Sequence, residues 1–141
     1  MLVGEIDGRS FMKAIAIQRV LGSIFLVLGL WVLLFPGHAE RTALSPDHYI
    51  GSYSSAVLIG CFGAQAVLCS TLVFTSVFTS RTFLIFGIVG SVPFFIFNYY
   101  FLYVVPIFNN WMFLDFVGNI GILLCGIVGW RIKINEEMLA T

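Results

Sequence analysis

Charged residues are scarce in this sequence. Only 10% of its 141 residues are Asp, Glu, Lys or Arg, whereas 60% are hydrophobic, and the mean hydropathy is +1.02. Soluble domains carry about 25% charged and about 45–50% apolar residues. The composition therefore excludes an ordinary soluble domain, and the apolar content excludes a disordered chain. We expect an integral membrane protein, embedded in the lipid bilayer and folded as a single domain over residues 1–141.

An excess of one charge, paired cysteines and clustered histidines are also lacking. Seven basic residues balance seven acidic ones, so no basic surface for nucleic acid is expected. The two histidines, His38 and His48, share one polar segment with a spacing that matches no metal motif. We therefore expect neither a metal nor a cofactor. No Cys-x-x-Cys pair occurs, and we expect the cysteines to be buried and unpaired. They are Cys61, Cys69 and Cys125.

Long apolar runs are what the sequence has instead. A membrane-spanning helix needs about 20 apolar residues. The runs are continuous, which favours helices over the alternating pattern of a β-barrel. Short connections place neighbouring helices antiparallel, so we expect an all-α membrane protein with an antiparallel four-transmembrane-helix bundle. The expected spans are about 14–36, 49–77, 82–105 and 111–130.

The basic residues are distributed unevenly over the connections. Of the seven Lys and Arg residues, only Arg41 falls in the first connection, and none falls in the third. The positive-inside rule then places both termini in the cytoplasm. We expect residues 37–47 to form a loop and residues 135–141 to form a polar tail. A signal peptide that ends at Gly37-His38-Ala39 is the alternative interpretation of the first run.

Each run carries one stripe of small or polar residues. At 100° per residue, Asp115, Asn119 and Gly126 share one face of the last run with Ile122. Small residues allow membrane helices to approach closely, so we expect the stripes to line the interior of the bundle. The stripes of the other three runs are Gln18, Gly22 and Gly29; Ser54, Cys61, Gln65, Cys69 and Ser76; and Gly87, Ser91 and Asn98.

Pro93 interrupts the third run near its middle. Proline has no backbone N–H, so a carbonyl in the preceding turn is left free for a serine side chain or a water molecule. The position predicts either a kink that opens a pocket or a feature of helix packing.

Asp115 is the only acidic residue inside an apolar run. Ionisable residues in membrane spans are costly, and they usually mark functional sites. Asn119 follows one turn later, and Asn98, next to Tyr99, lies at a similar depth to Asp115. Gln65 and Asn119 lie near the bilayer midplane. We expect these five residues to form a ligand-binding site for a headgroup, an ion or a proton. Alternatively, Asp115 is close enough to its helix end to reach interfacial water.

The overall layout resembles a known family. A glycine-dotted first run leads into Leu34-Phe35-Pro36-Gly37, and three further spans follow. This layout resembles the DoxX-like small four-helix membrane proteins across most of the chain, and it implies a fold without any functional residue. We expect a non-enzymatic accessory protein or a binder of a lipid-like molecule, with a membrane protein or a second copy as candidate partners. The alternatives are a small homodimeric proton-coupled transporter and a lipid- or sterol-modifying isomerase that uses Asp115.

Overall fold

The computed structural model describes residues 3–139, and their side chains over 12–138. Within this part of the chain no strand occurs. Four segments are long and apolar enough to cross a membrane, namely Met12–Leu34, Tyr53–Thr75, Ser80–Val104 and Asn110–Met138. The prediction of an all-helical chain with four segments able to span a membrane is therefore confirmed for the described residues. The helical elements are α1 (Val3–Leu34), α2 (Pro36–Ala43), η1 (Pro46–His48), α3 (Tyr53–Thr75), α4 (Ser80–Val89), α5 (Val92–Tyr99), η2 (Tyr100–Val104), η3 (Asn110–Met112) and α6 (Phe113–Leu139).

Two boundaries differ from the prediction. The expected loop at 37–47 begins as helix α2, because Pro36 provides a preorganised first turn. The last helix does not end in a polar tail. It continues to Leu139, because the added turns contain good helix formers and Glu136 pairs with Lys133 at 2.6 Å. Glu137, in the same turns, reaches Ser80 at the start of α4.

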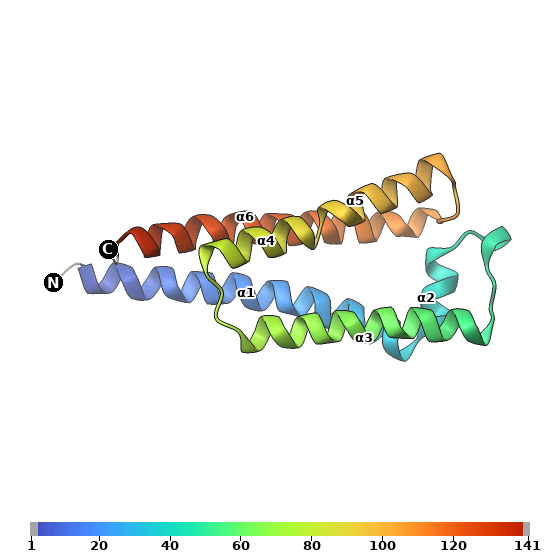
Figure 1. The fold of residues 1–141 in the computed structure, drawn as a ribbon, viewed down its shortest axis with the longest axis horizontal. Helices are drawn as coiled ribbons and strands as arrows, with labels where there is room; N and C mark the ends of the chain where they lie inside the picture. Colours follow the sequence, from blue (N-terminus) through green and yellow to red (C-terminus); the bar gives the residue numbers. More distant parts are fainter. Residues whose placement is uncertain (1–2, 140–141) are drawn as a thin grey trace.

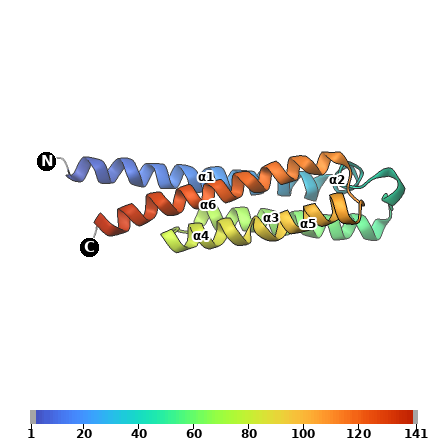
Figure 2. The same cartoon turned by 90° about the horizontal axis from the view of Figure 1, so that it is seen from above.

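Helix α1 lies between α3 and α6 in Figure 1, and along one edge of the molecule in the view turned by 90° (Figure 2). It packs against α3 on one side and α6 on another, while α4 and α5 lie along α6. The start of α1 and the end of α6 lie at one end of the long axis, and α2 lies toward the other end. A buried apolar cluster joins the helices; it consists of Ala14, Leu21, Val73, Phe78, Phe83 and Ile122.

Glycines mark the closest helix crossings. A Cβ atom added to Gly29 on α1 would lie 2.8 Å from the backbone nitrogen of Val67 on α3. A Cβ added to Gly126 on α6 would lie 2.5 Å from Cα of Gly87 on α4. Both approaches are too close for any side chain, which is how small residues allow membrane helices to pack. The predicted interior positions of Gly29, Gly87 and Gly126 are therefore confirmed.

The predicted interior face of α3 is wrong. Gln65 and Cys61 are exposed, and the residues of α3 that are buried are Gly63, Ser70 and Val73. The close crossing with α1 at Gly63 turns this face inward, and the Ser70 hydroxyl donates to the carbonyl of Gly22 at 2.8 Å. The expectation of three buried cysteines fails for Cys61, while Cys69 and Cys125 are half-buried.

The third span is broken where Pro93 was expected to act. Helix α4 ends at Val89, and α5 starts at Val92 with Pro93 in its first turn. The buried Ser91 hydroxyl donates to the carbonyl of Gly87 one turn earlier. A serine side chain therefore satisfies a carbonyl at the break, although it is the carbonyl of Gly87 and not that of Val89, four residues before Pro93.

Candidate polar site between α5 and α6

Three predicted site residues meet between α5 and α6. The side-chain amide of Asn98 donates to Asp115 Oδ2 at 2.7 Å, and that of Asn119 donates to the same oxygen at 2.9 Å. Asn98 is 0% exposed and Asn119 is 4% exposed, whereas Asp115 is half-buried. The structure therefore brings together a carboxylate and two amides from two helices.

Helical spacing and close packing assemble this polar cluster. Asp115 and Asn119 are one turn apart on α6, so their side chains lie on one face. Asn98 is buried on the same side of its span as Gly87, which touches α6. Beside the cluster, the rings of Phe95 and Phe116 join α5 and α6 at a centroid distance of 4.9 Å. The polar cluster and this ring pair therefore both join α5 to α6.

One atom of the polar cluster is unpaired. The amide oxygen of Asn98 is buried and has no hydrogen-bond partner among the described residues. Buried polar atoms are nearly always paired, and an unpaired one costs about 1–3 kcal/mol. The carboxylate of Asp115 is a second acceptor. The cluster is thus rich in acceptors, and it complements a group that donates hydrogen bonds.

The helix changes its geometry two residues after Asn98. Residues Tyr100–Val104 form a π-helical turn, in which the N–H of Val105 bonds to the carbonyl of Tyr100 at 2.9 Å. Single π turns are rare and frequently occur at functional sites. A surface hollow of about 320 Å³ lies at this end of the third span; it is lined by Leu102, Tyr103, Asn110 and Phe113.

Two predicted site residues lie elsewhere. Tyr99 is 61% exposed, and its ring packs against that of Tyr103 at 5.6 Å. Adjacent helical residues point about 100° apart, which turns Tyr99 away when Asn98 is inside. Gln65 lies on the exposed side of α3. The structure therefore separates both residues from the polar cluster.

The first and third connections pack together at the same end of the molecule. The N–H of Asn109 donates to the carbonyl of Ala43, and that of Ser45 donates to the carbonyl of Ile107, each at 2.9 Å. The side chain of Asn109 also donates to the carbonyl of Leu44 at 3.2 Å. These bonds tie α2 and its following segment to the turn that precedes the polar cluster.

An acidic residue that the sequence does not mark as special is buried where the first and third connections meet. Glu40 on α2 is only 2% exposed, and its Oε1 accepts the N–H of Gly51 at 3.3 Å. Its neighbour Arg41 donates to the hydroxyl of Tyr49 at 3.1 Å, which raises the pKa of the Arg41 guanidinium. No sequence signal marks Glu40 as buried, because its surroundings form only when the two connections meet.

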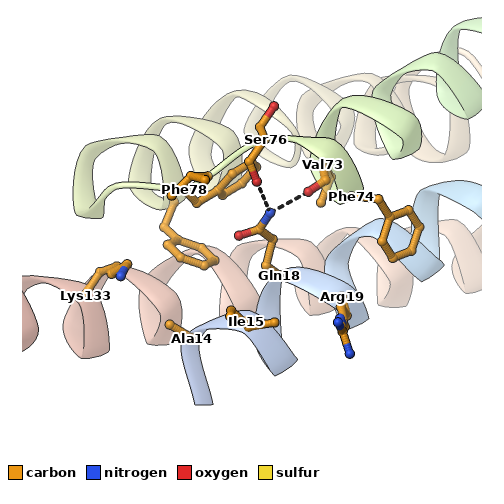
Figure 3. A pocket seen from close by; sticks show the side chains of 11 residues that line it. Ala14, Ile15, Gln18, Arg19, Val73, Phe74, Ser76, Phe78 and Lys133 are labelled. Atoms are coloured by element: carbon orange, nitrogen blue, oxygen red, sulfur yellow. Dashed lines mark hydrogen bonds between the residues drawn. The ribbon is translucent and has the colours of Figure 1, made fainter. Parts of the chain in front are cut away.

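A second polar feature lies toward the opposite end of the molecule (Figure 3). A cavity of about 240 Å³ lies beside Gln18, whose amide donates to the carbonyls of Val73 and Ser76 at the end of α3. The last carbonyls of a helix lack partners within that helix. Gln18 therefore caps α3. The cavity is lined by Ala14, Ile15, Gln18, Arg19, Val73, Phe74, Ser76, Val77, Phe78, Phe83 and Lys133.

Comparison of the chain with protein-family models, with curated proteins and with solved structures finds no match in any of the three. The resemblance to DoxX-like proteins therefore stays a prediction about layout. The geometry of the polar cluster is the feature of the chain that bears on its function.

Proposed function

We propose that this chain is a small multi-pass membrane protein that holds the polar group of a lipid-like ligand between α5 and α6. In this proposal the four spans form an antiparallel bundle, and both ends of the chain face the cytoplasm. The distribution of charge supports this orientation. Arg81, Arg131 and Lys133 fall at the end that is proposed to be cytoplasmic, and Arg41 alone falls at the other.

The observation that carries the proposal is the unequal pairing inside the polar cluster. Two amides donate to one carboxylate oxygen of Asp115, while the buried oxygen of Asn98 has no partner among the described residues. An ammonium group has enough N–H donors to satisfy both acceptors, whereas a hydroxyl, with a single hydrogen, would satisfy one of them. A long-chain alcohol or amine fits this chemistry, and the neighbouring Phe95 and Phe116 rings favour an aliphatic chain.

Binding is better supported than proton transfer. A general acid or base usually works with a second titratable group within hydrogen-bond reach. The groups that donate to Asp115 are two neutral amides, and Tyr99 is turned away. This arrangement suits a group that is held in place rather than one whose proton is passed on.

Thermal unfolding of the protein in nanodiscs tests the proposal. Hexadecanol and hexadecylamine supply a donor, whereas hexadecyl methyl ether has a similar chain without one. We expect the first two to stabilise the protein by up to about 2.7 kcal/mol at 100 times the dissociation constant, and the ether to have little effect.

Variants show where the stabilising ligand binds. Asp115→Asn and Asn98→Leu should abolish the stabilisation, whereas Asn135→Ala, at an exposed amide near the end of α6, should retain it. Equal stabilisation by the ether, or stabilisation that persists in both cluster variants, would refute a donor-binding site at this cluster.

A further inference from the structure

Helix α3 packs through one side only. It lies along an edge of the fold and contacts chiefly α1 and α2 (Figure 1). Its buried residues face α1. The opposite side, the outer face of α3, is exposed. The outer face consists of Leu58, Cys61, Gln65, Leu68 and Leu72, which follow the alternating three- and four-residue spacing of a coiled-coil seam.

Gln65 is the unusual member of this outer face. It lies near the middle of Tyr53–Thr75, at the depth where hydrocarbon surrounds an exposed side chain. Its amide makes no hydrogen bond to any described residue, whereas Gln18, Asn98 and Asn119 all donate. Hydrocarbon offers neither donors nor acceptors, so an amide left there is costly. A partner outside this fold would remove that cost.

The lipid-facing side of α6 provides the contrast. Its exposed residues over the same depth include Val117, Ile120, Leu124 and Val128, all of them apolar. That face matches a surface that remains in contact with lipid. The outer face of α3 does not match it, because its central position is a primary amide.

We propose that a second copy of this chain docks on the outer face of α3, with Gln65 of each copy hydrogen-bonded to Gln65 of the other. An amide carries both donors and an acceptor, so it is complementary to itself. Two copies inserted with the same orientation are related by a two-fold axis along the membrane normal. Such an axis brings the same residue of both copies to the same depth, in a parallel α3 pair. A single polar residue in a seam of this kind sets its register.

Disulfide crosslinking through the native Cys61 tests the proposed dimer, because Cys61 lies one turn from Gln65 on the outer face. The test uses the full chain in liposomes with Cys69→Ser and Cys125→Ser, oxidised with copper phenanthroline. We expect a disulfide-linked dimer on non-reducing gels. The matched control moves the only cysteine to the lipid-facing side of α6 by Leu124→Cys in the cysteine-free chain, and we expect it to remain monomeric. No dimer through Cys61, or an equal yield from the control, overturns the proposal.

Stoichiometry in liposomes tests the role of Gln65 independently of cysteine chemistry. Photobleaching steps counted over a dilution series give the dimer dissociation constant. Gln65→Leu should raise this constant about three- to thirty-fold, as expected for the loss of interhelical amide hydrogen bonds, while Gln65→Asn should change it less. Because Gln65 is exposed, neither change disturbs the fold of a single copy. Single-step bleaching at all dilutions or an unchanged constant for Gln65→Leu overturns the proposal, and so does crosslinking of Cys61 only to a different protein when the oxidation is repeated in native membranes.

Discussion

Replacing the two amides of the polar cluster separately should give different losses of stability. Asn119→Leu removes one hydrogen bond to a carboxylate. Hydrogen bonds between membrane helices are worth about 0.6 kcal/mol on average and about 1.7 kcal/mol at most, and a charged acceptor favours the upper part of that range. We therefore expect Asn119→Leu to lower the free energy of unfolding by about 1–2 kcal/mol.

Asn98→Leu removes a similar bond but also the buried oxygen that has no partner among the described residues. Removing an unpaired buried oxygen eliminates its desolvation cost and raises the free energy of unfolding by about 1–3 kcal/mol. The two effects oppose each other, so we expect the free energy of unfolding to change by between about −1 and +2 kcal/mol. The structure thus predicts that Asn98 adds little to the stability of the ligand-free protein, although it is completely buried.

Unfolding titrations in mixed micelles, followed by circular dichroism, measure both changes on the same scale. The decisive quantity is the difference between the two variants, because errors in the unfolded reference state cancel in part. If Asn98→Leu proves as destabilising as Asn119→Leu, the oxygen of Asn98 has a partner in the folded protein. The cluster would then have no unpaired buried oxygen to accept a hydrogen bond from a ligand.

Three further changes test the packing and the helix ends. Gly126→Ala should destabilise the protein by several kcal/mol, because the new Cβ would lie 2.5 Å from Cα of Gly87, and a thermal melt measures the loss. Glu137→Ala removes the carboxylate that accepts from the N–H and hydroxyl of Ser80 at the start of α4, and it should lower the free energy of unfolding in a micelle titration. Gln18→Leu uncaps the carbonyl end of α3 and should cost about 1–2 kcal/mol by the same titration. An effect no larger than that of the matched control would contradict each prediction. The controls are Gly60→Ala, Asn135→Ala and Ser23→Ala, in that order.

The four spans and the polar cluster could be predicted because the relevant patterns are local. The spans follow from the lengths of the apolar runs, which need no knowledge of tertiary contacts. The face of α6 follows from one helical period, since its small and polar residues share a stripe and large residues fill the remaining arc. Asn98 could be added because it has a similar depth to Asp115. Tyr99 was misassigned because proximity along a helix does not imply a shared direction.

The inward face of α3 could not be predicted by the same means. Both of its sides carry small or polar residues, so periodicity alone does not distinguish them. The packing of α1 determines which side of α3 is buried, because the backbone of α1 at Gly29 fits closely against Gly63. Such a fit depends on the shapes of two helices and is absent from either sequence segment alone.

The misplacement of Gln65 has a physical meaning of its own. The prediction assumed that a polar residue in the middle of a span must face the interior of its own chain. A low free energy requires less than this. The amide must be hydrogen-bonded and shielded from lipid, but its partner need not belong to the same chain. Asn119 meets this requirement inside one copy, whereas Gln65 would meet it only at a contact between copies. An exposed polar residue in the middle of a span is therefore consistent with either location, and the proposed dimer through α3 gives Gln65 the second one.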